Sequence, residues 1–153
     1  MANTYTQFNI HIVFAVKGRE NVLTKNFRND LFRYISGILK NSAQFPLAVN
    51  GYKDHVHVFF ELNPKYSISD IVRDIKANSS KWINDNKFVL GKFSWQEGYG
   101  GFSYSRSQRN TVIQYIINQE EKHSGITFRE EYLKLLHDFE IEFKNEYVFE
   151  FYD

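Results

Sequence analysis

Strand-like and helix-like patterns of apolar residues alternate along this chain of 153 residues in the order β-α-β-β-α-β-α. Strands are expected over residues 5–16, 47–51, 56–62 and 102–105, and helices over residues 24–42, 67–86, 108–123 and 127–137. This order is the split β-α-β arrangement, in which an antiparallel sheet carries its helices on one face. The chain is therefore expected to adopt an α+β, ferredoxin-like fold whose other sheet face is available for a functional site.

The length of the chain suits one domain with one hydrophobic core, over residues 1–153, with an acidic C-terminal tail from about residue 124. The absence of cysteine excludes disulfide bonds, thiolate metal sites and a cysteine nucleophile. The sequence shows no leader-like segment and no apolar run near the roughly 18 residues of a membrane span. A cytoplasmic protein without a membrane partner is therefore expected.

The net charge of +1 conceals an uneven distribution along the chain. Residues 1–119 carry 15 Lys/Arg and 8 Asp/Glu, whereas residues 120–153 carry 4 Lys/Arg and 10 Asp/Glu. A basic body is compatible with a face that binds phosphate groups, although an ordinary solvated surface explains the same charges equally well. The candidate phosphate contacts are Lys17, Arg19, Lys81 and Arg106.

Two histidines alternate with apolar residues in the third expected strand. Successive side chains of a strand point to opposite faces, so Val56 and Val58 share one face while His55 and His57 share the other. The two imidazoles are then about 6–7 Å apart along the strand and can converge on one metal ion. A pair of half-exposed histidines with no ligand is the alternative interpretation.

A tyrosine and a glutamine share one face of the helix expected over residues 108–123. Tyr115 and Gln119 are four residues apart, which makes them neighbours on the helix surface beside an apolar stripe. A tyrosine at such an edge commonly packs its ring and exposes its hydroxyl, so this stretch alone does not indicate chemistry.

Together, these stretches resemble the HUH single-tyrosine transposases of the insertion-sequence 200/605 class, which include the repeat-associated tyrosine transposases. The class is named for a His-hydrophobic-His motif, here His55-Val56-His57, and its nucleophile lies in a Tyr-x-x-x-Gln helix, here Tyr115 to Gln119. The resemblance extends over nearly the whole chain. The other similar segments are residues 14–19, 77–84, 95–103 and 119–123.

The resemblance implies metal-dependent cleavage and strand transfer of single-stranded DNA through a 5′-phosphotyrosine, the chemistry of DNA transposition. It makes Tyr115, on a C-terminal catalytic helix, the nucleophile, and His55, His57 and Gln119 the ligands of one divalent cation, Mg²⁺ or Mn²⁺. It also implies a homodimer that recognises hairpins in single-stranded DNA near the ends of a mobile element.

Other interpretations remain open from the sequence. The chain could be a domesticated HUH nickase with the same chemistry, or a non-catalytic single-stranded nucleic-acid-binding domain that uses exposed aromatic rings. Trp82, Trp95 and Tyr99 could stack on bases, although core packing is the expected role of both tryptophans. His11 and His123 are expected to be structural or surface residues.

Overall fold

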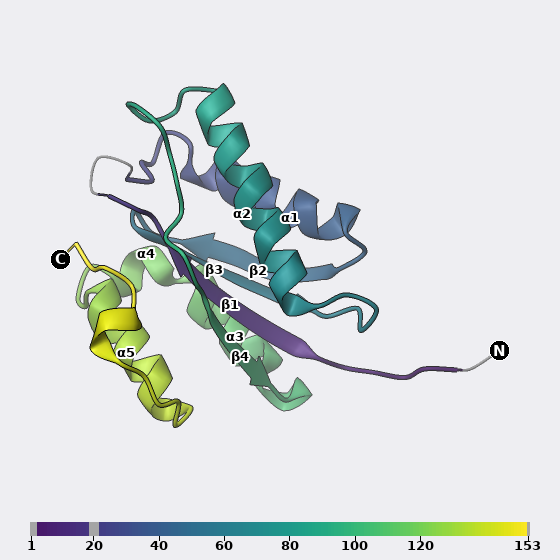
Figure 1. The fold of residues 1–153 in the computed structure, drawn as a ribbon. Coiled ribbons are helices and arrows are strands. Elements are labelled where there is room, and N and C mark those ends of the chain that lie inside the picture. Colours follow the sequence, from purple (N-terminus) through teal and green to yellow (C-terminus); the bar gives the residue numbers. More distant parts are fainter. Residues whose placement is uncertain (1–2, 19–21, 153) are drawn as a thin grey trace.

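The computed structural model describes residues 3–18 and 22–152, and Figure 1 shows their fold. Four antiparallel strands form one sheet in the order β2-β3-β1-β4; they are β1 (Asn9–Ala15), β2 (Phe45–Gly51), β3 (His55–Glu61) and β4 (Gly100–Tyr104). The helices are α1 (Arg28–Asn41), α2 (Ile68–Asp85), α3 (Arg109–Ile117), α4 (Gln119–Lys122) and α5 (Phe128–Asp138). The expected α+β, ferredoxin-like fold is thereby confirmed.

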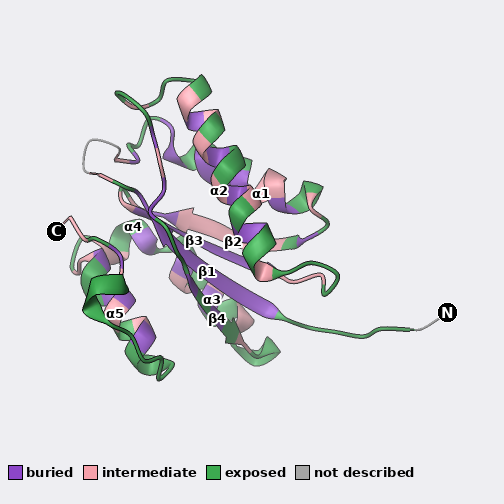
Figure 2. Cartoon of the chain, in the orientation of Figure 1, coloured by how far each residue is buried: buried purple, intermediate pink, exposed green. Residues whose placement is uncertain are grey.

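The sheet lies between two layers of helices. α1 and α2 cover one face, and α3 and α5 lie on the other (Figure 1). Alternation along β3 directs Val56 and Phe60 into the main core, where they are buried with Leu31 of α1 and Ile75 of α2. The inner strand β1 is buried along its length (Figure 2). Phe59 points the other way and forms a second apolar cluster with residues of α3. β3 therefore has a purely structural face and a face that looks toward the C-terminal helices.

α2 and α5 begin within one residue of the expected bounds, and α1 does not. Ser67 and Thr127 cap α2 and α5, because each side chain accepts a hydrogen bond from a backbone N–H group of the first turn. Thr24 instead begins a turn through its carbonyl oxygen, and α1 starts only at Arg28. None of the helices in residues 3–18 and 22–152 is long and apolar enough to cross a membrane.

The helix expected over residues 108–123 is interrupted. A short 3₁₀ turn, Arg106–Gln108, leads into α3, and a break at Asn118 separates α3 from α4. The break lies between Tyr115 and Gln119, so these two residues belong to different helices rather than to one continuous face. Their relative placement therefore depends on how each helix packs on the sheet.

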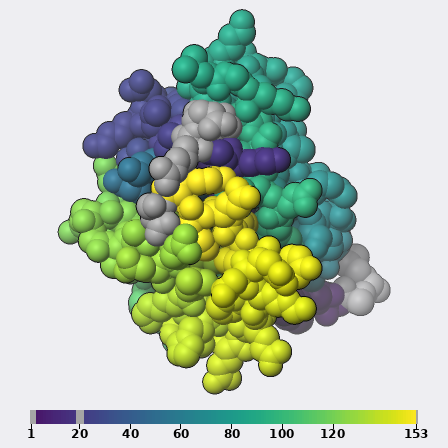
Figure 3. All heavy atoms as spheres, turned by 60° about the vertical axis from the view of Figure 1, so that its left-hand side comes forward, coloured from purple at the N-terminus to yellow at the C-terminus, as the bar shows by residue number. Residues whose placement is uncertain are grey.

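The part of the acidic tail that follows α5, residues 139–152, packs on the body of the protein mainly without regular structure. A 3₁₀ turn, Asn145–Tyr147, is its only helical element among the described residues. The backbone of Glu150 exchanges two hydrogen bonds of 2.8 Å with the side chain of Gln96, and Phe149 is buried against Phe128. In Figure 3 the tail, in yellow, lies on the surface beside α5. The tail thereby fastens α5 to the sheet.

The last residue of β2, next to the turn into β3, must be glycine. A Cβ atom on Gly51 would lie 2.2 Å from the backbone oxygen of His55, which cannot move aside without disturbing β3. Gly51→Ala is expected to lower the free energy of unfolding by about 1–3 kcal/mol, as other overpacked positions do. Chemical denaturation of the purified protein would measure this change.

Gly37 provides the matched control, because a Cβ atom at this position in α1 meets no heavy atom within 4 Å. Gly37→Ala is expected to stabilise the protein by about 0.5–1 kcal/mol through the higher helix propensity of alanine. Equal effects of the two substitutions would contradict the role assigned to Gly51.

Candidate active site

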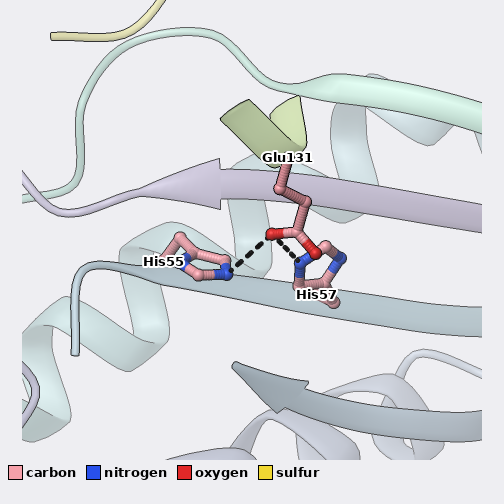
Figure 4. A group of neighbouring side chains, drawn as sticks. All are labelled: His55, His57 and Glu131. Carbon is pink, nitrogen blue, oxygen red and sulfur yellow. Dashed lines mark hydrogen bonds and ion pairs between the residues drawn. The ribbon is translucent and has the colours of Figure 1, made fainter. Parts of the chain in front are cut away.

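β3 presents His55 and His57 toward α3 and α5, and both side chains are completely buried. Their Nε2 atoms each lie 3.3 Å from Oε1 of Glu131, which reaches them from the first turn of α5 (Figure 4). The strand period correctly predicted that the two imidazoles share a face. The carboxylate between them was not predicted.

Glu131 connects the imidazole pair to the expected nucleophile. Its Oε1 atom faces the histidines, whereas its Oε2 atom accepts a hydrogen bond of 2.7 Å from the side-chain amide of Gln119 and another from the hydroxyl of Tyr115. His55, His57 and Glu131 offer three possible ligand atoms within 4.8 Å of one another. One buried carboxylate thus contacts every residue that the sequence singled out for chemistry.

Gln119 lies next to the histidine pair, as the resemblance to the HUH transposases implied. Its Oε1 atom is 2.9 Å from Nε2 of His55, and its side chain is completely buried. The structure therefore brings His55, His57, Gln119 and Tyr115 together within a single chain.

His11 and His123 lie inside the same cluster, so neither is a surface residue. Nε2 of His11 is 2.7 Å from Nδ1 of His57. Nε2 of His123 is 2.9 Å from Oε1 of Glu131, and its Nδ1 atom donates to the carbonyl oxygen of Ile126 at 2.8 Å. The strand pattern around His11 gave no sign of this contact, because the contact depends on the register of β1 against β3, which the sequence does not reveal.

The inward-facing atoms of the cluster fit a cation. Asp54 accepts from Nδ1 of His55 at 2.7 Å, which leaves the lone pair of neutral His55 on Nε2, pointing at oxygens of Gln119 and Glu131. Acceptor atoms that face one another need a proton or a metal ion between them. Their separations of 2.9–3.3 Å match the roughly 3 Å between adjacent oxygen or nitrogen ligands placed about 2.1 Å from one ion.

The electrostatics of the site favour positive charge next to Glu131. Burial disfavours the charged imidazole of His55, but the carboxylates of Asp54 and Glu131 outweigh burial and raise its pKa to about 9. Burial lowers the pKa of the neighbouring His57. For Glu131, burial alone would raise the pKa, whereas His57, His123 and His55 bring it far below its usual range. An ionised carboxylate therefore lies among imidazoles, as it would around a divalent cation.

Tyr115 lies at the edge of this cluster, half-buried, with its ring centroid 5.7 Å from that of His57. Burial and the adjacent charge of Glu131 raise the pKa of its hydroxyl, which donates to that carboxylate. A pocket next to the ring is lined by Tyr115, Asn118, Glu121 and Lys122. The phenol is thus held in its neutral form beside an opening to the surface.

Side chains at both ends of α3 fix the position of this helix on the sheet. At its start, Arg109 donates two hydrogen bonds, of 3.1 and 2.8 Å, to Oδ1 of Asn9 on β1. At its end, the amide of Asn50 on β2 donates to the carbonyl oxygens of Ile116 and Ile117 at 3.0 and 2.9 Å. These bonds satisfy backbone groups at the break before α4 and hold Tyr115 above the histidines.

The candidate phosphate contacts among the described residues do not all lie on the same face of the sheet. Lys81 is exposed on α2, on the sheet face opposite α3, and pairs with Asp85 at 2.6 Å. Lys17 and Arg106 are exposed near the ends of β1 and α3, and Arg19 lies outside the described residues. Any contact that Lys81 makes with DNA is therefore remote from Tyr115.

Both tryptophans have the packing roles expected of them. Trp95 is buried and donates to the hydroxyl of Ser79 at 3.0 Å, and Trp82 stacks on Tyr34 with centroids 4.9 Å apart. Tyr99 is more exposed, and its hydroxyl lies 3.0 Å from that of Ser69.

Known proteins share this fold and parts of this sequence. The curated ISDra2 transposase TnpA of Deinococcus radiodurans is 23% identical over 121 residues, which cover 76% of this chain and 86% of that protein. The crystal structure of a Deinococcus radiodurans R1 protein superposes with a TM-score of 0.61 at 22% identity, covering 78% of this chain and 95% of that one. A REP-associated tyrosine transposase bound to a REP hairpin superposes with a TM-score of 0.60 at 16% identity, covering 82% and 74%.

At these identities, the two solved structures establish the fold alone. The sequence profile of the family described as "Transposase IS200 like" matches residues 4–119, which include the histidine pair, Tyr115 and Gln119. Most of the chain is thus accounted for by one family of DNA transposition enzymes, and the chain belongs to the IS200-like transposase family.

Proposed function

We propose that this transposase cleaves and rejoins single-stranded DNA through a 5′-phosphotyrosine formed on Tyr115, with a divalent cation bound to the histidine pair. The observation that carries the proposal is the meeting of the Tyr115 hydroxyl and the Nε2 atoms of His55 and His57 at one buried carboxylate. On this proposal, residues 1–153 act as one transposase domain, and the C-terminal segment contributes Glu131 to the site.

The proposed ligands are His55, His57 and Gln119, joined by Oε1 of Glu131. The amide and carboxylate oxygens suit Mg²⁺ or Mn²⁺. Because the imidazoles and the amide are neutral, the carboxylate is the one charged ligand in this set, and net positive charge is left for the substrate. When bound, the cation supplies Lewis-acid stabilisation to the phosphoryl group. Asp54 fixes the ring of His55, so that its Nε2 atom faces the other ligands.

Tyr115 performs the covalent step. Its phenolic oxygen attacks the scissile phosphorus, the bond to the 3′-oxygen breaks, and that oxygen leaves as a hydroxyl after taking up a proton from solvent. The hydroxyl proton of Tyr115 passes to solvent water at the same stage, because a phenol with its ordinary pKa of about 10 is a weak nucleophile at neutral pH until it loses that proton. The energy of the phosphodiester is kept in the 5′-phosphotyrosine, so a 3′-hydroxyl can reverse the reaction without ATP.

Hairpin-containing single-stranded DNA is the proposed substrate. A structural relative was solved bound to a REP hairpin, and residues 1–119 of this chain have an excess of positive charge. Lys17, Arg19, Lys81 and Arg106 remain proposed phosphate contacts. We further propose that two copies of the chain cooperate as a homodimer, because moving a DNA segment requires both of its ends to be processed.

The decisive experiment is incubation of the purified chain with hairpin-containing single-stranded DNA from the flanks of its own gene, in the presence of Mg²⁺. A covalent adduct is expected, with the DNA attached through its 5′-phosphate to Tyr115, as mapped by mass spectrometry of the digested protein. Metal-independent DNA binding without any adduct would instead favour a non-catalytic binding domain.

Replacing Glu131 tests its place among the ligands. Glu131→Gln keeps the size of the side chain and one acceptor oxygen but removes its negative charge. Mn²⁺ affinity, measured by isothermal titration calorimetry, is expected to fall about 10–100-fold. Glu130→Gln, at the exposed neighbouring position of α5, is the matched control and should leave the affinity unchanged. Unchanged affinity with faster cleavage in Glu131→Gln would mean that Glu131 blocks the site rather than binding the ion.

A further inference from the structure

His11, on the inner strand β1, faces the same side of the sheet as the two proposed metal ligands of β3. Its Nε2 atom lies 2.7 Å from Nδ1 of His57, and the two rings stack with centroids 5.0 Å apart. Both side chains are completely buried. This contact is therefore the hydrogen bond that fixes the ring of His57 on the sheet.

The direction of that hydrogen bond depends on what lies at the other nitrogen of His57. A neutral imidazole carries a hydrogen on only one of its two nitrogens. If Nε2 of His57 coordinates a cation, the hydrogen must be on Nδ1, and Nε2 of His11 must accept it. The hydrogen of His11 is then on its own Nδ1 atom, which lies 3.4 Å from the hydroxyl oxygen of Tyr104.

We propose that His11 is a positioning residue of the metal site, which accepts the Nδ1 hydrogen of His57 and so keeps the Nε2 lone pair of that ring directed at the cation. The inference rests on the proposed function, because it requires His57 to coordinate a metal. Without the cation, Nε2 of His57 donates to Glu131, 3.3 Å away, and Nδ1 accepts from His11 instead. Metal binding thus moves the hydrogen of each ring from Nε2 to Nδ1, and the pair gains or loses no proton.

The two proposed histidine ligands differ in the group that contacts their Nδ1 atom. His55 is held by the carboxylate of Asp54, 2.7 Å from its Nδ1 atom, and an ionised carboxylate can only accept a hydrogen bond. His57 is held by an imidazole, which can either donate or accept. The change of tautomer is therefore expected on the His57 side of the site alone.

Substitution of His11 separates positioning from packing. His11→Phe keeps a buried planar ring but removes both nitrogens, so Nδ1 of metal-bound His57 loses its acceptor. Mn²⁺ affinity of the full chain, measured by calorimetry, is expected to fall about 10–100-fold, the usual effect of losing such a partner. His11→Gln, whose side-chain oxygen can accept the same hydrogen, is expected to recover most of the affinity. Ile12→Val, in the core on the other face of β1, is the control and should bind Mn²⁺ normally.

Long-range ¹H–¹⁵N spectra of the imidazole rings report which nitrogen carries the hydrogen. Addition of Mg²⁺ is expected to move the hydrogen of His11 from Nε2 to Nδ1, a change that a purely structural histidine would not show. If the unsubstituted protein binds Mn²⁺ and a folded His11→Phe variant binds it equally well, His11 is not a positioning residue, although the proposed metal site is still supported. If the unsubstituted protein binds neither Mg²⁺ nor Mn²⁺, both the proposed metal site and the positioning role of His11 are wrong.

Discussion

Tyr115→Phe is expected to reduce DNA cleavage by at least about 10³-fold and to abolish the covalent adduct, because the substitution removes only the attacking oxygen. The ring keeps its place against His57, and the lost hydroxyl bond to Glu131 should change the free energy of unfolding by no more than about 1–2 kcal/mol. DNA binding is expected to persist. Gel assays with end-labelled single-stranded DNA would measure cleavage, adduct and binding in one series.

The matched control for this substitution is Tyr34→Phe. Tyr34 stacks on Trp82 in the α1–α2 layer, on the opposite side of the sheet from Tyr115. Removing its hydroxyl should leave cleavage unchanged. A Tyr115→Phe variant that still cuts DNA at the original rate would eliminate the phosphotyrosine mechanism.

The double substitution His55→Ala with His57→Ala is expected to eliminate detectable binding of Mn²⁺ and to reduce metal-dependent cleavage on the order of 10³-fold. Two of the proposed ligands are lost, and the buried carboxylate of Glu131 loses its contacts with both imidazoles while keeping the one with His123. The loss of these two partners by a buried carboxylate should also lower the thermal stability. Calorimetry with Mn²⁺, cleavage assays over a range of Mg²⁺ concentrations and thermal melts would separate these effects.

If the double variant unfolds, a single substitution and a control still test this prediction. His57→Asn retains a polar side chain in the cluster but shortens it beyond the reach of the proposed ion, so it should also lose Mn²⁺ binding. His137→Ala, at an exposed position on α5, should behave like the original chain. Normal metal binding by a folded His57→Asn variant would rule out His57 as a ligand.

The features that the sequence predicted correctly depend on local periodicity. The two-residue period of β3 places His55 and His57 on one face, and the apolar stripes predicted α1, α2 and α5 to within a few residues of their bounds. The helix break at Asn118 was not predicted. In the structure, the side-chain amide of Asn50 on β2 donates to the carbonyl oxygens of Ile116 and Ile117, next to the break. Such a contact arises from tertiary packing and leaves no trace in the pattern of α3 itself.

Glu131 was not predicted as a site residue, although its spacing in the sequence indicated that it is buried. In α5 it occurs three residues after Phe128 and one residue before Tyr132, which places its carboxylate within the buried apolar stripe of the helix. An acidic residue in such a stripe needs a partner of opposite charge or a metal ion. The partners themselves could not be named, because they come from β3 and α4, far away in the sequence.

The proposed nucleophile and every proposed ligand come from one polypeptide, and this has a consequence for how two DNA ends are joined. On this proposal a single chain contains the groups needed to cut one end, so each subunit of the proposed homodimer can cut without groups from its partner. The DNA can then help to coordinate the two cuts, because holding both ends close together raises the effective concentration of the second subunit. The order of events at a mobile element would accordingly be set by the spacing of its ends.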